Sequence, residues 1–278
     1  INNKYEFYSK EFSEYLNSYY QQFGIPQDKG KRGNISRPTT EQIFQYFNTI
    51  SQRVNCLIES DSLNSNSIKL IVTGLHHECQ HQELLVYDLQ HLLADQYRPI
   101  RKNEKGKSAN VEQKSVQIKG GIYTMGYNGN EYCYDIELPE HKVYLENYSI
   151  DMFPVTNEQY LKFIEDGGYD TYKHWLSDGW EKVKANEWKS PMYWEKIEGQ
   201  WNVRDFLGNR KLNPKEPVCH VSYYEADAYC KWAGKRLPTE AEWEKAACWN
   251  EEKQQKTIFP WGNEPPQEQN ANLLESYH

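Results

Sequence analysis

The chain has 278 residues, enough for two domains of ordinary size that each bury a core. Its formal net charge of −8 argues against a phosphate backbone as partner, since nucleic-acid binding needs a basic face. With a mean hydropathy of −0.94, no apolar run of about 18 residues and no opening signal segment, we expect a globular, cytoplasmic protein without membrane or nucleic-acid partners.

The pattern of the first part of the chain predicts helices, and the first 115 residues contain no tryptophan. Pro38 and Thr39 followed by Gln42 resemble a helix start with a capping box. The apolar stripe that follows is formed by Ile43, Phe47, Ile50, Val54 and Ile58. We also expect a helix over Glu11–Phe23 and one over Ser67–Ala94, so three helices suggest most of a bundle. The buried side of the last should comprise Ile71, Leu75, Leu84, Leu85 and Leu92.

Residues 102–114 are polar and lack apolar periodicity, so we interpret them as a linker between domains over residues 1–101 and 115–278. Short apolar runs predict strands at Ser115–Lys119, Ile122–Met125 and His141–Leu145. Helices are expected over Asn157–Glu165, entered through Thr156, and Tyr223–Ala233, entered through Ser222. Between these two helices lies a stretch rich in Trp, Gly and Pro, where we expect little regular structure and extensive aromatic packing. All nine tryptophans of the chain lie between Trp175 and Trp261.

The segment Gly74–Glu83, with the sequence GLHHECQHQE, carries the clearest chemical signal. His77 and His81 are four residues apart, which on a helix places both imidazoles on one face and within reach of one ion. Neutral imidazole suits Fe, Zn, Cu or Ni. Asp88 and His91 fall on roughly the same face and are candidates for orienting a ligand. The competing interpretation is that these are ordinary polar residues of an amphipathic helix.

The same motif permits two other interpretations. His77, Glu78 and His81 spell H-E-x-x-H, in which two histidines bind zinc and the glutamate is the general base of a hydrolase. A non-enzymatic binding module that keeps a vestigial metal pair is the third. The motif alone does not decide among these classes.

The wider sequence resembles one family. The stretch GLHHECQHQELLVYDLQHLL (Gly74–Leu93) is similar to the metal-binding helix of the DinB-like domain in ergothioneine sulfoxide synthases, and Arg32–Thr39 resembles that family's RG-x-x-SRP-T segment. The second half resembles the formylglycine-generating-enzyme-like (sulfatase-modifying factor) domain that follows in the same family. The matching stretches there are Gly120–Gly126, Pro154–Asn157, FIEDGGY at Phe163–Tyr169, WLSDGW at Trp175–Trp180, Pro217–Glu244 and FPWGN at Phe259–Asn263.

The resemblance implies an α+β protein: a DinB-like helical bundle followed by an irregular, C-type-lectin-like α+β domain, both incomplete. It implies a non-haem Fe(II) enzyme that joins O₂, a cysteine-containing thiol and the betaine hercynine, forms a C–S bond and oxidises the sulfur to a sulfoxide. The thiol would be γ-glutamylcysteine or cysteine, and the sequence leaves a selenium donor or unmethylated histidine open. A Ca²⁺ ion in the second domain is also implied, without a clear ligand set.

The resemblance also assigns residues. His77 and His81 match two of three iron ligands, and Gln80 matches a glutamine that faces the imidazole substrate. The two arginines of the Arg32–Thr39 segment, Arg32 and Arg37, are suited to clamp a substrate carboxylate, because a guanidinium binds carboxylates bidentately. Solvated arginines in a helix-entry loop are the alternative.

The chain also departs from that family's pattern. It starts with Ile1 and has no histidine before His76, whereas the family's first ligand lies in an upstream segment. His76 points about 100° away from His77 around a helix, so we do not expect it to be the third ligand. The family's catalytic tyrosine falls beyond His278. We therefore expect a fragment, truncated at both ends and inactive by itself.

The remaining candidates favour structural interpretations. His220 lies just before a predicted helix and should be a hydrogen-bonded structural residue. We expect Cys219 and Cys230 to be packing residues, and Cys79 to lie in the core or on the surface. The six cysteines are scattered without a CxxC pair, which is typical of reduced thiols.

Overall fold

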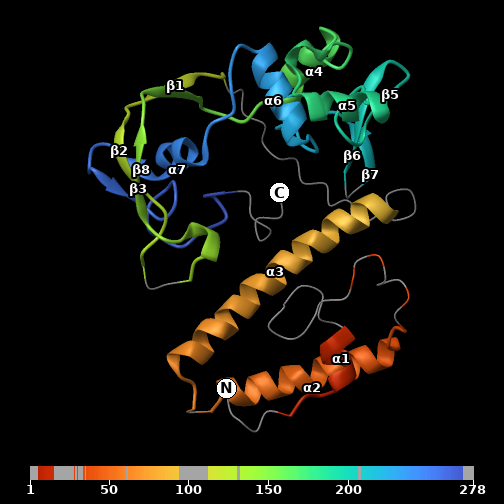
Figure 1. Ribbon diagram of the computed structural model, residues 1–278, viewed down its shortest axis with the longest axis vertical. Helices are drawn as coiled ribbons and strands as arrows, with labels where there is room; N and C mark the ends of the chain where they lie inside the picture. Colours follow the sequence, from red (N-terminus) through yellow and green to blue (C-terminus); the bar gives the residue numbers. More distant parts are fainter. Residues whose placement is uncertain are drawn as a thin grey trace. The chain divides into compact units, whose positions relative to one another are not determined.

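The computed structural model describes residues 6–15, 28, 30, 34, 36–60, 62–93, 112–129, 132–205 and 208–271 (Figure 1). Helices and short antiparallel strand pairs make it an α+β protein, as the sequence predicted. The contacts divide the chain into unit 1, Ile1–Gln80, and unit 2, His81–His278, with the division inside one helix. Each unit is described by itself.

The described part of unit 1 contains helices and no strand. It contains α1 (Lys10–Tyr15), α2 (Thr40–Ile58) and the first part of α3 (Ser65–Leu93). The predicted capping box begins α2: the Gln42 amide N–H donates to Thr39 Oγ1 at 3.2 Å, and the Thr39 amide N–H donates to Gln42 Oε1 at 2.8 Å. The two bonds satisfy donors that the first helical turn leaves without partners. The remainder of the predicted helix over Glu11–Phe23, beyond Tyr15, falls on residues that are not described.

A small aromatic cluster joins the N-terminal segment to α2. The ring centroids of Tyr8 and Phe12 lie 5.3 and 5.5 Å from that of Tyr46, within the range of favourable aromatic pairs. Arg53 Nη1 also donates to the Glu6 carbonyl at 2.8 Å. These contacts hold α1 against one side of α2.

The expected bundle core is not buried. The predicted stripe of α2 forms on one face, yet Phe47 is 63% exposed, Ile58 is 48% exposed, and the described helix has no buried residue. In α3, Leu75 is 63% exposed and Leu92 is 75% exposed, so the predicted buried side of that helix is wrong. The physical reason is that an amphipathic helix buries its stripe only where neighbouring helices cover it.

Two strand pairs come after α3 in unit 2 (Figure 1). Strand β1 (Ser115–Ile118) pairs antiparallel with β4 (Tyr148–Asp151), and β2 (Gly121–Met125) pairs antiparallel with β3 (His141–Leu145). The strands predicted near residues 115, 122 and 141 are therefore confirmed, with β4 added. A short 3-10 helix, η3 (Asp135–Glu137), lies between β2 and β3.

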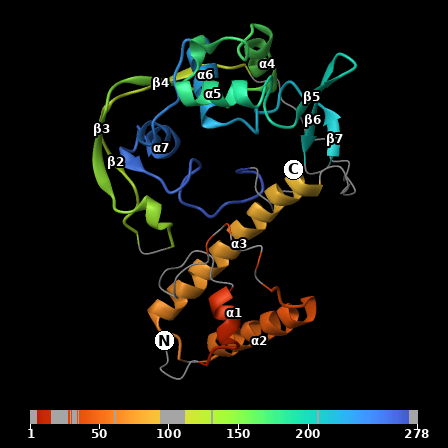
Figure 2. The same cartoon turned by 45° about the vertical axis from the view of Figure 1, so that its right-hand side comes forward.

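Helix α7 (Glu240–Cys248) packs against β2 and β3 (Figure 2). Tyr123, Leu145 and Tyr148 are buried there, with Trp249 of the small β8 (Trp249–Asn250) and β9 (Gln255–Lys256) pair beside them. Glu244 accepts from the Tyr123 hydroxyl at 2.8 Å. This hydrogen bond of the half-buried Glu244 carboxylate ties the helix to the sheet.

A second core of unit 2 lies among other helices. These are α4 (Asn157–Glu165), η4 (Tyr172–His174), α5 (Ser177–Ala185) and α6 (Tyr223–Trp232). Phe163 and Ala228 are fully buried, and the rings around Phe163 belong to Tyr160, Tyr169, Trp175, Tyr229 and Trp232. A Cβ at Gly168 would approach the Phe163 ring to 2.3 Å, so only glycine fits there. The predicted aromatic packing is confirmed.

The stretch between α4 and α6 is more regular than expected. Besides η4 and α5 it contains a three-stranded antiparallel sheet of β5 (Trp194–Ile197), β6 (Gln200–Asp205) and β7 (Gly208–Lys211). The expectation of little regular structure was wrong because these strands are short and are separated by turns, so no strand extends long enough to show clear alternation. Trp194, Val203 and Leu212 form the core beside this sheet.

None of the helices in the described ranges has the length and apolar composition needed to cross a membrane.

The first prediction concerns the second core. Changing Phe163, which is fully buried, to alanine removes a ring from the aromatic cluster and should lower the free energy of unfolding by about 3–5 kcal/mol. Urea denaturation of the full-length protein measures this. Tyr172→Ala is the control, because Tyr172 is 73% exposed, and should change stability by less than about 0.5 kcal/mol. Similar losses in both variants would contradict this core.

The second prediction concerns Glu242 at the start of α7. Hydrogen bonds from Arg236 lower the pKa of Glu242 from 4.5 to about 2, with the amide of Thr239 also contributing. A carboxyl whose pKa is lower in the folded state stabilises the fold above 4.5, and that stabilisation disappears as the pH falls toward 2. Glu242→Gln keeps the capping geometry but loses the charge. The variant should therefore be less stable than the wild type near neutral pH, and this difference in unfolding free energy should shrink as the pH falls.

Glu240→Gln is the matched control for Glu242→Gln. Glu240 is exposed and also lies in the first turn of α7, so it shares any general interaction with the helix dipole. Equal pH dependence in the two variants would show that the helix end, rather than the Arg236 pair, is responsible.

Candidate functional site

The histidine motif lies on α3, which the structure describes as helical throughout Ser65–Leu93. Asn64 begins the helix: its Oδ1 accepts from the Ser67 amide N–H at 2.9 Å, and its carbonyl accepts from the Ile68 amide at 3.1 Å. This is the bonding pattern of an N-cap residue. The predicted helix over Ser67–Ala94 is therefore confirmed to within two residues at its start.

His77 and His81 lie one turn apart on this continuous helix, with Cβ atoms roughly 5–6 Å apart as helix geometry requires. His77 is half-buried and His81 is exposed. Two imidazoles in this arrangement suit a borderline metal such as iron, so the donor set fits the proposed ion as two of its ligands. His76 is displaced by about 100° around the axis and does not share their face.

The described residues supply no larger donor set. Among them, no group of three or more His, Cys, Asp and Glu side chains is placed to hold a metal ion. The assignment of His77 and His81 as ligands stays a prediction.

The neighbouring motif residues are also placed by the helix. Glu78, Cys79 and Gln80 are all exposed on α3. Arg37 is exposed immediately before the Pro38–Thr39 start of α2, and Arg32 lies among the residues that are not described. The substrate-binding assignments of Gln80, Arg32 and Arg37 therefore stay predictions.

Asp88 and His91 do not support the metal ligands in the way the sequence suggested. Asp88 is seven residues from His81, about 10 Å further along the helix axis, which is beyond hydrogen-bond reach. His91 is further still, and its Nδ1 lies 3.0 Å from the Tyr193 hydroxyl instead. The prediction that Asp88 and His91 orient a metal-bound histidine is therefore wrong. They lie on roughly the same face of α3 as the histidine pair, but too far along the helix axis to contact it.

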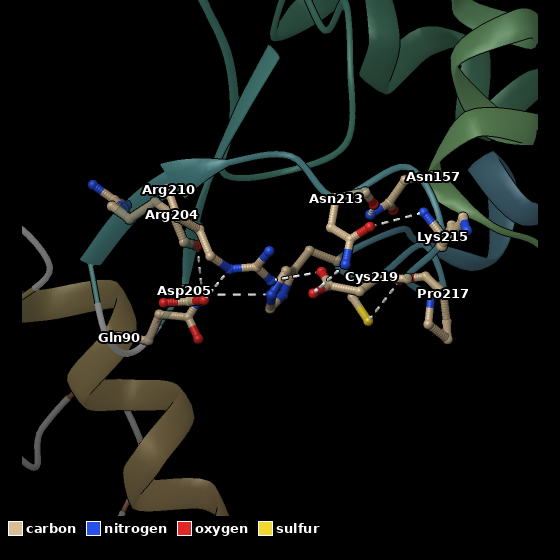
Figure 3. A network of polar contacts seen from close by, with 11 residues as sticks. Gln90, Asn157, Arg204, Asp205, Arg210, Asn213, Lys215, Pro217 and Cys219 are labelled. Atoms are coloured by element: carbon tan, nitrogen blue, oxygen red, sulfur yellow. Dashed lines mark hydrogen bonds and ion pairs between the residues drawn. The ribbon is translucent and has the colours of Figure 1, made fainter. Parts of the chain in front are cut away.

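Gln90 is the residue that sequence reasoning missed. It is 8% exposed and is the buried residue of α3, and its Nε2 donates to the Arg204 carbonyl at 3.2 Å. The same nitrogen lies 3.4 Å from His220 Nε2. Figure 3 shows Gln90 reaching from α3 to Arg204 at the end of β6. A glutamine among leucines gives no sequence signal for burial, so only the tertiary contacts identify it.

His220 confirms the prediction of a hydrogen-bonded structural residue. It has a φ of 61°, and its ring packs edge-on against Tyr193 with centroids 4.9 Å apart. Desolvation by these neighbours lowers the pKa of His220, while the charge of Asp205 opposes that shift. The imidazole is therefore held toward its neutral form.

A polar network lies next to this cluster (Figure 3). Arg210 donates through Nε to Asp205 at 2.6 Å and through Nη2 to Glu216 at 2.7 Å. Desolvation alone would lower the pKa of Arg210, but the hydrogen bonds to both carboxylates raise it above its usual value. The network joins β6 and β7 to the loop that leads to α6.

The cysteines behave as reduced thiols, since all six are free. Cys230 packs against the second core as predicted, Cys79 is on the surface, and Cys219 is exposed rather than a packing residue. Partial desolvation of the thiol and the charge of Glu216 raise the pKa of Cys219, which does not favour a nucleophile.

Comparison with known proteins agrees with this architecture. Residues 101–278 match the sulfatase-modifying factor enzyme 1-like domain. A hercynine oxygenase of Mycolicibacterium smegmatis is 35% identical over 206 residues, covering 72% of this chain and 46% of the relative. A hercynine oxygenase of Mycobacterium tuberculosis is 41% identical over 139 residues, or 50% of this chain and 32% of the relative. The formylglycine-generating enzyme of Bos taurus is 34% identical over 174 residues, or 58% of this chain and 46% of the relative.

The chain spans about half, or less, of the length of these curated relatives. The alignment with the first hercynine oxygenase covers more residues than 101–278 contain, so that likeness extends upstream of the matched domain. The family match itself covers more than half of the chain. The chain thus belongs to the sulfatase-modifying factor enzyme 1-like domain family, with homologues among the hercynine oxygenases.

Proposed function

We propose that the chain is part of a non-haem Fe(II), O₂-dependent sulfoxide synthase that joins a cysteine-containing thiol to the imidazole of hercynine in ergothioneine biosynthesis. One observation carries this proposal: the likeness to a hercynine oxygenase covers 72% of this chain and so reaches upstream of the shared domain into α3, the helix on which His77 and His81 lie. The formylglycine-generating enzyme of Bos taurus covers 58% of the chain, less than the 72% covered by the Mycolicibacterium smegmatis hercynine oxygenase but more than the 50% covered by that of Mycobacterium tuberculosis.

The overall reaction balances without a further reductant. A thiol R–SH and the imidazole C–H each lose one hydrogen, a C–S bond forms, one oxygen atom of O₂ becomes the sulfoxide oxygen, and the other leaves as water. Bound iron supplies redox chemistry and open coordination positions for the reactants. The protein supplies proximity, because holding the reactants together removes the entropic cost of a multi-body encounter.

Each predicted residue has a distinct role in this scheme. His77 and His81 hold the ion through their imidazole nitrogens. Gln80, on the same turn of α3, is suited to orient the imidazole substrate, because its amide both donates and accepts hydrogen bonds. Arg37, together with Arg32, is suited to bind the carboxylate of the thiol substrate in a bidentate manner.

The domain plan belongs to the same proposal. Residues 1–101 form a DinB-like helical metal-binding domain, residues 102–114 a linker and residues 115–278 the formylglycine-generating-enzyme-like domain. The substrates are small molecules, the thiol is γ-glutamylcysteine or cysteine, and the compartment is the cytoplasm. A Ca²⁺ ion in the second domain stays a prediction of the resemblance.

The third prediction concerns metal binding. In the full-length protein, His77→Ala and His81→Ala should each weaken Co(II) binding, used as a spectroscopic probe for Fe(II), by more than about 100-fold, because each removes a direct ligand. Titration followed by visible absorption measures the affinity. His76→Ala is the matched control on the same helix and should bind Co(II) like the wild type. A loss of the same size in His76→Ala would contradict the assigned pair.

The fourth prediction concerns activity and separates the reaction classes. The full-length protein with Fe(II), hercynine and γ-glutamylcysteine should consume O₂ and form a sulfoxide detectable by mass spectrometry. Gln80→Ala should raise the KM for hercynine about 10-fold, as expected for the loss of one or two hydrogen bonds to the substrate. Glu78→Gln should retain most of the activity, because Glu78 has no part in this chemistry.

Other outcomes identify the competing functions. Zinc-dependent peptide cleavage that disappears in Glu78→Gln would establish the H-E-x-x-H hydrolase instead. Full-length protein that binds neither metal and consumes no O₂ would leave the binding module as the explanation.

A further inference from the structure

The last turn of α3 is attached to unit 2 by two adjacent polar residues. Unit 2 contains residues 81–93 of this helix, so the contacts lie within one unit. Gln90 is buried and bonds to partners 114 and 130 residues further along the chain, and His91 Nδ1 lies 3.0 Å from the Tyr193 hydroxyl. Among the neighbouring apolar residues, Leu92 is 75% exposed, whereas Leu89 and Leu93 are half-buried. The hydrogen bonds of Gln90 and His91 provide the directional part of the attachment.

The hydrogen-bond partners of Gln90 determine the orientation of its side-chain amide. A carbonyl oxygen only accepts, so the side-chain atom of Gln90 that faces the Arg204 carbonyl is the amide nitrogen. That nitrogen has a second hydrogen, and His220 Nε2 lies 3.4 Å away to accept it. His220 can do so only as a neutral imidazole with its proton on Nδ1. The attachment thus requires one protonation state of His220.

Two residues of the surface that contacts the last turn of α3 have unfavourable backbone conformations. Tyr193 and His220 have φ values of 69° and 61°, a region that residues other than glycine rarely adopt. Backbone bonds hold both: the Arg204 amide donates to the Tyr193 carbonyl at 3.0 Å, and the Met192 amide donates to the His220 carbonyl at 3.2 Å. The Arg204 guanidinium also lies 5.0 Å from the centre of the Tyr193 ring. Two such residues in contact are typical of a functional position rather than an incidental turn.

We propose that Gln90 and His91 are positioning residues for the reaction: together with Tyr193, Arg204 and His220 they form a latch that fixes where, within unit 2, α3 presents His81. This inference rests on the proposed function. His81 is nine residues before Gln90, about 13 Å along a continuous helix. Because a helix is stiff over this length, a shift or rotation of its anchored last turn is carried to His81.

The latch depends on pH through the groups around His220. Gln90 of α3 faces its Nε2, the Tyr193 ring before β5 packs on it, and the Asp205 carboxylate at the end of β6 raises its pKa against the larger desolvation effect. The folded-state pKa lies below the ordinary 6.5, so the latch is fully formed above 6.5 and weakens as the pH falls from there through the lower folded value. When His220 is protonated, its Nε2 carries a hydrogen that points at the N–H of Gln90, so the hydrogen bond between the two side chains is lost.

The fifth prediction tests the latch in the full-length protein by hydrogen exchange of the peptide covering the last turns of α3. Gln90→Ala should speed its exchange about 10-fold at pH 7.5, the effect of losing a buried hydrogen-bonding group. With Fe(II) bound, kcat should fall about 10- to 100-fold with KM nearly unchanged, because the metal-bearing helix is misplaced. Gln82→Ala is the control, since Gln82 is an exposed glutamine on the same helix.

Gln90→Glu distinguishes the latch from a merely structural residue. Because intrinsic amide exchange itself slows as the pH falls, the quantity to compare is protection, the intrinsic exchange rate divided by the observed rate at each pH. A carboxylate accepts from protonated His220 but repels the neutral ring and the Arg204 carbonyl, so protection of this peptide should increase as the pH is lowered from 7.5 to 5.5. The wild type should show the opposite trend. The same pH trend in both proteins would overturn the assigned role of His220.

Two further outcomes complete the test. Unchanged exchange in Gln90→Ala overturns the latch, and faster exchange with wild-type kcat overturns its positioning role. If the wild type turns over no substrate, the proposed function fails; the Co(II) absorption spectrum then replaces kcat, and a spectrum unaltered by Gln90→Ala overturns the positioning role independently.

Discussion

Aromatic packing around Phe163 is the interaction on which the rest of unit 2 depends. The fully buried ring contacts side chains of α4, α6 and the segment between them, so it fixes these elements together. Tyr169 donates to Glu225 at 2.6 Å, and the other oxygen of Glu225 accepts from the Ser222 amide that begins α6. His220 lies two residues before this start. The core therefore holds the surface that receives Gln90.

The distribution of buried apolar surface explains why polar contacts are important for the position of α3. Burial of apolar surface stabilises the core beneath α4 and α6, whereas the described α2 and α3 bury almost no apolar side chain. A helix without a buried stripe can be fixed in orientation only by directional contacts, and hydrogen bonds provide that direction. Gln90 and His91 meet this need at the end of the helix that carries the histidine pair.

The family membership and the helix chemistry address different parts of the function. The matched domain belongs to proteins with more than one activity, since the similar relatives include hercynine oxygenases and formylglycine-generating enzymes. What distinguishes the sulfoxide synthase proposal is the segment upstream of that domain, where the two imidazoles lie one turn apart on α3. The polar cluster at Gln90 then gives a physical route by which the domain could influence that helix.

The sequence by itself determined the features that depend on neighbouring residues. The capping box at Thr39 and the entry residues Thr156 and Ser222 predicted the helix starts, because an N-cap and its partner are only three residues apart. The spacing of His77 and His81 is equally local: residues four apart lie on one face of a helix, so the sequence placed both imidazoles there.

Only the tertiary structure decided which side chains are buried and which distant segments meet. The regular stripe of α2 gave no indication that Phe47 would remain exposed, because burial depends on what covers the helix. Likewise, Gln90 and His220 are 130 residues apart, and their contact requires the folded core, the left-handed backbone at His220 and the end of α3 at once. Local periodicity carries no information about such long-range pairs, since they form only when the whole unit has packed.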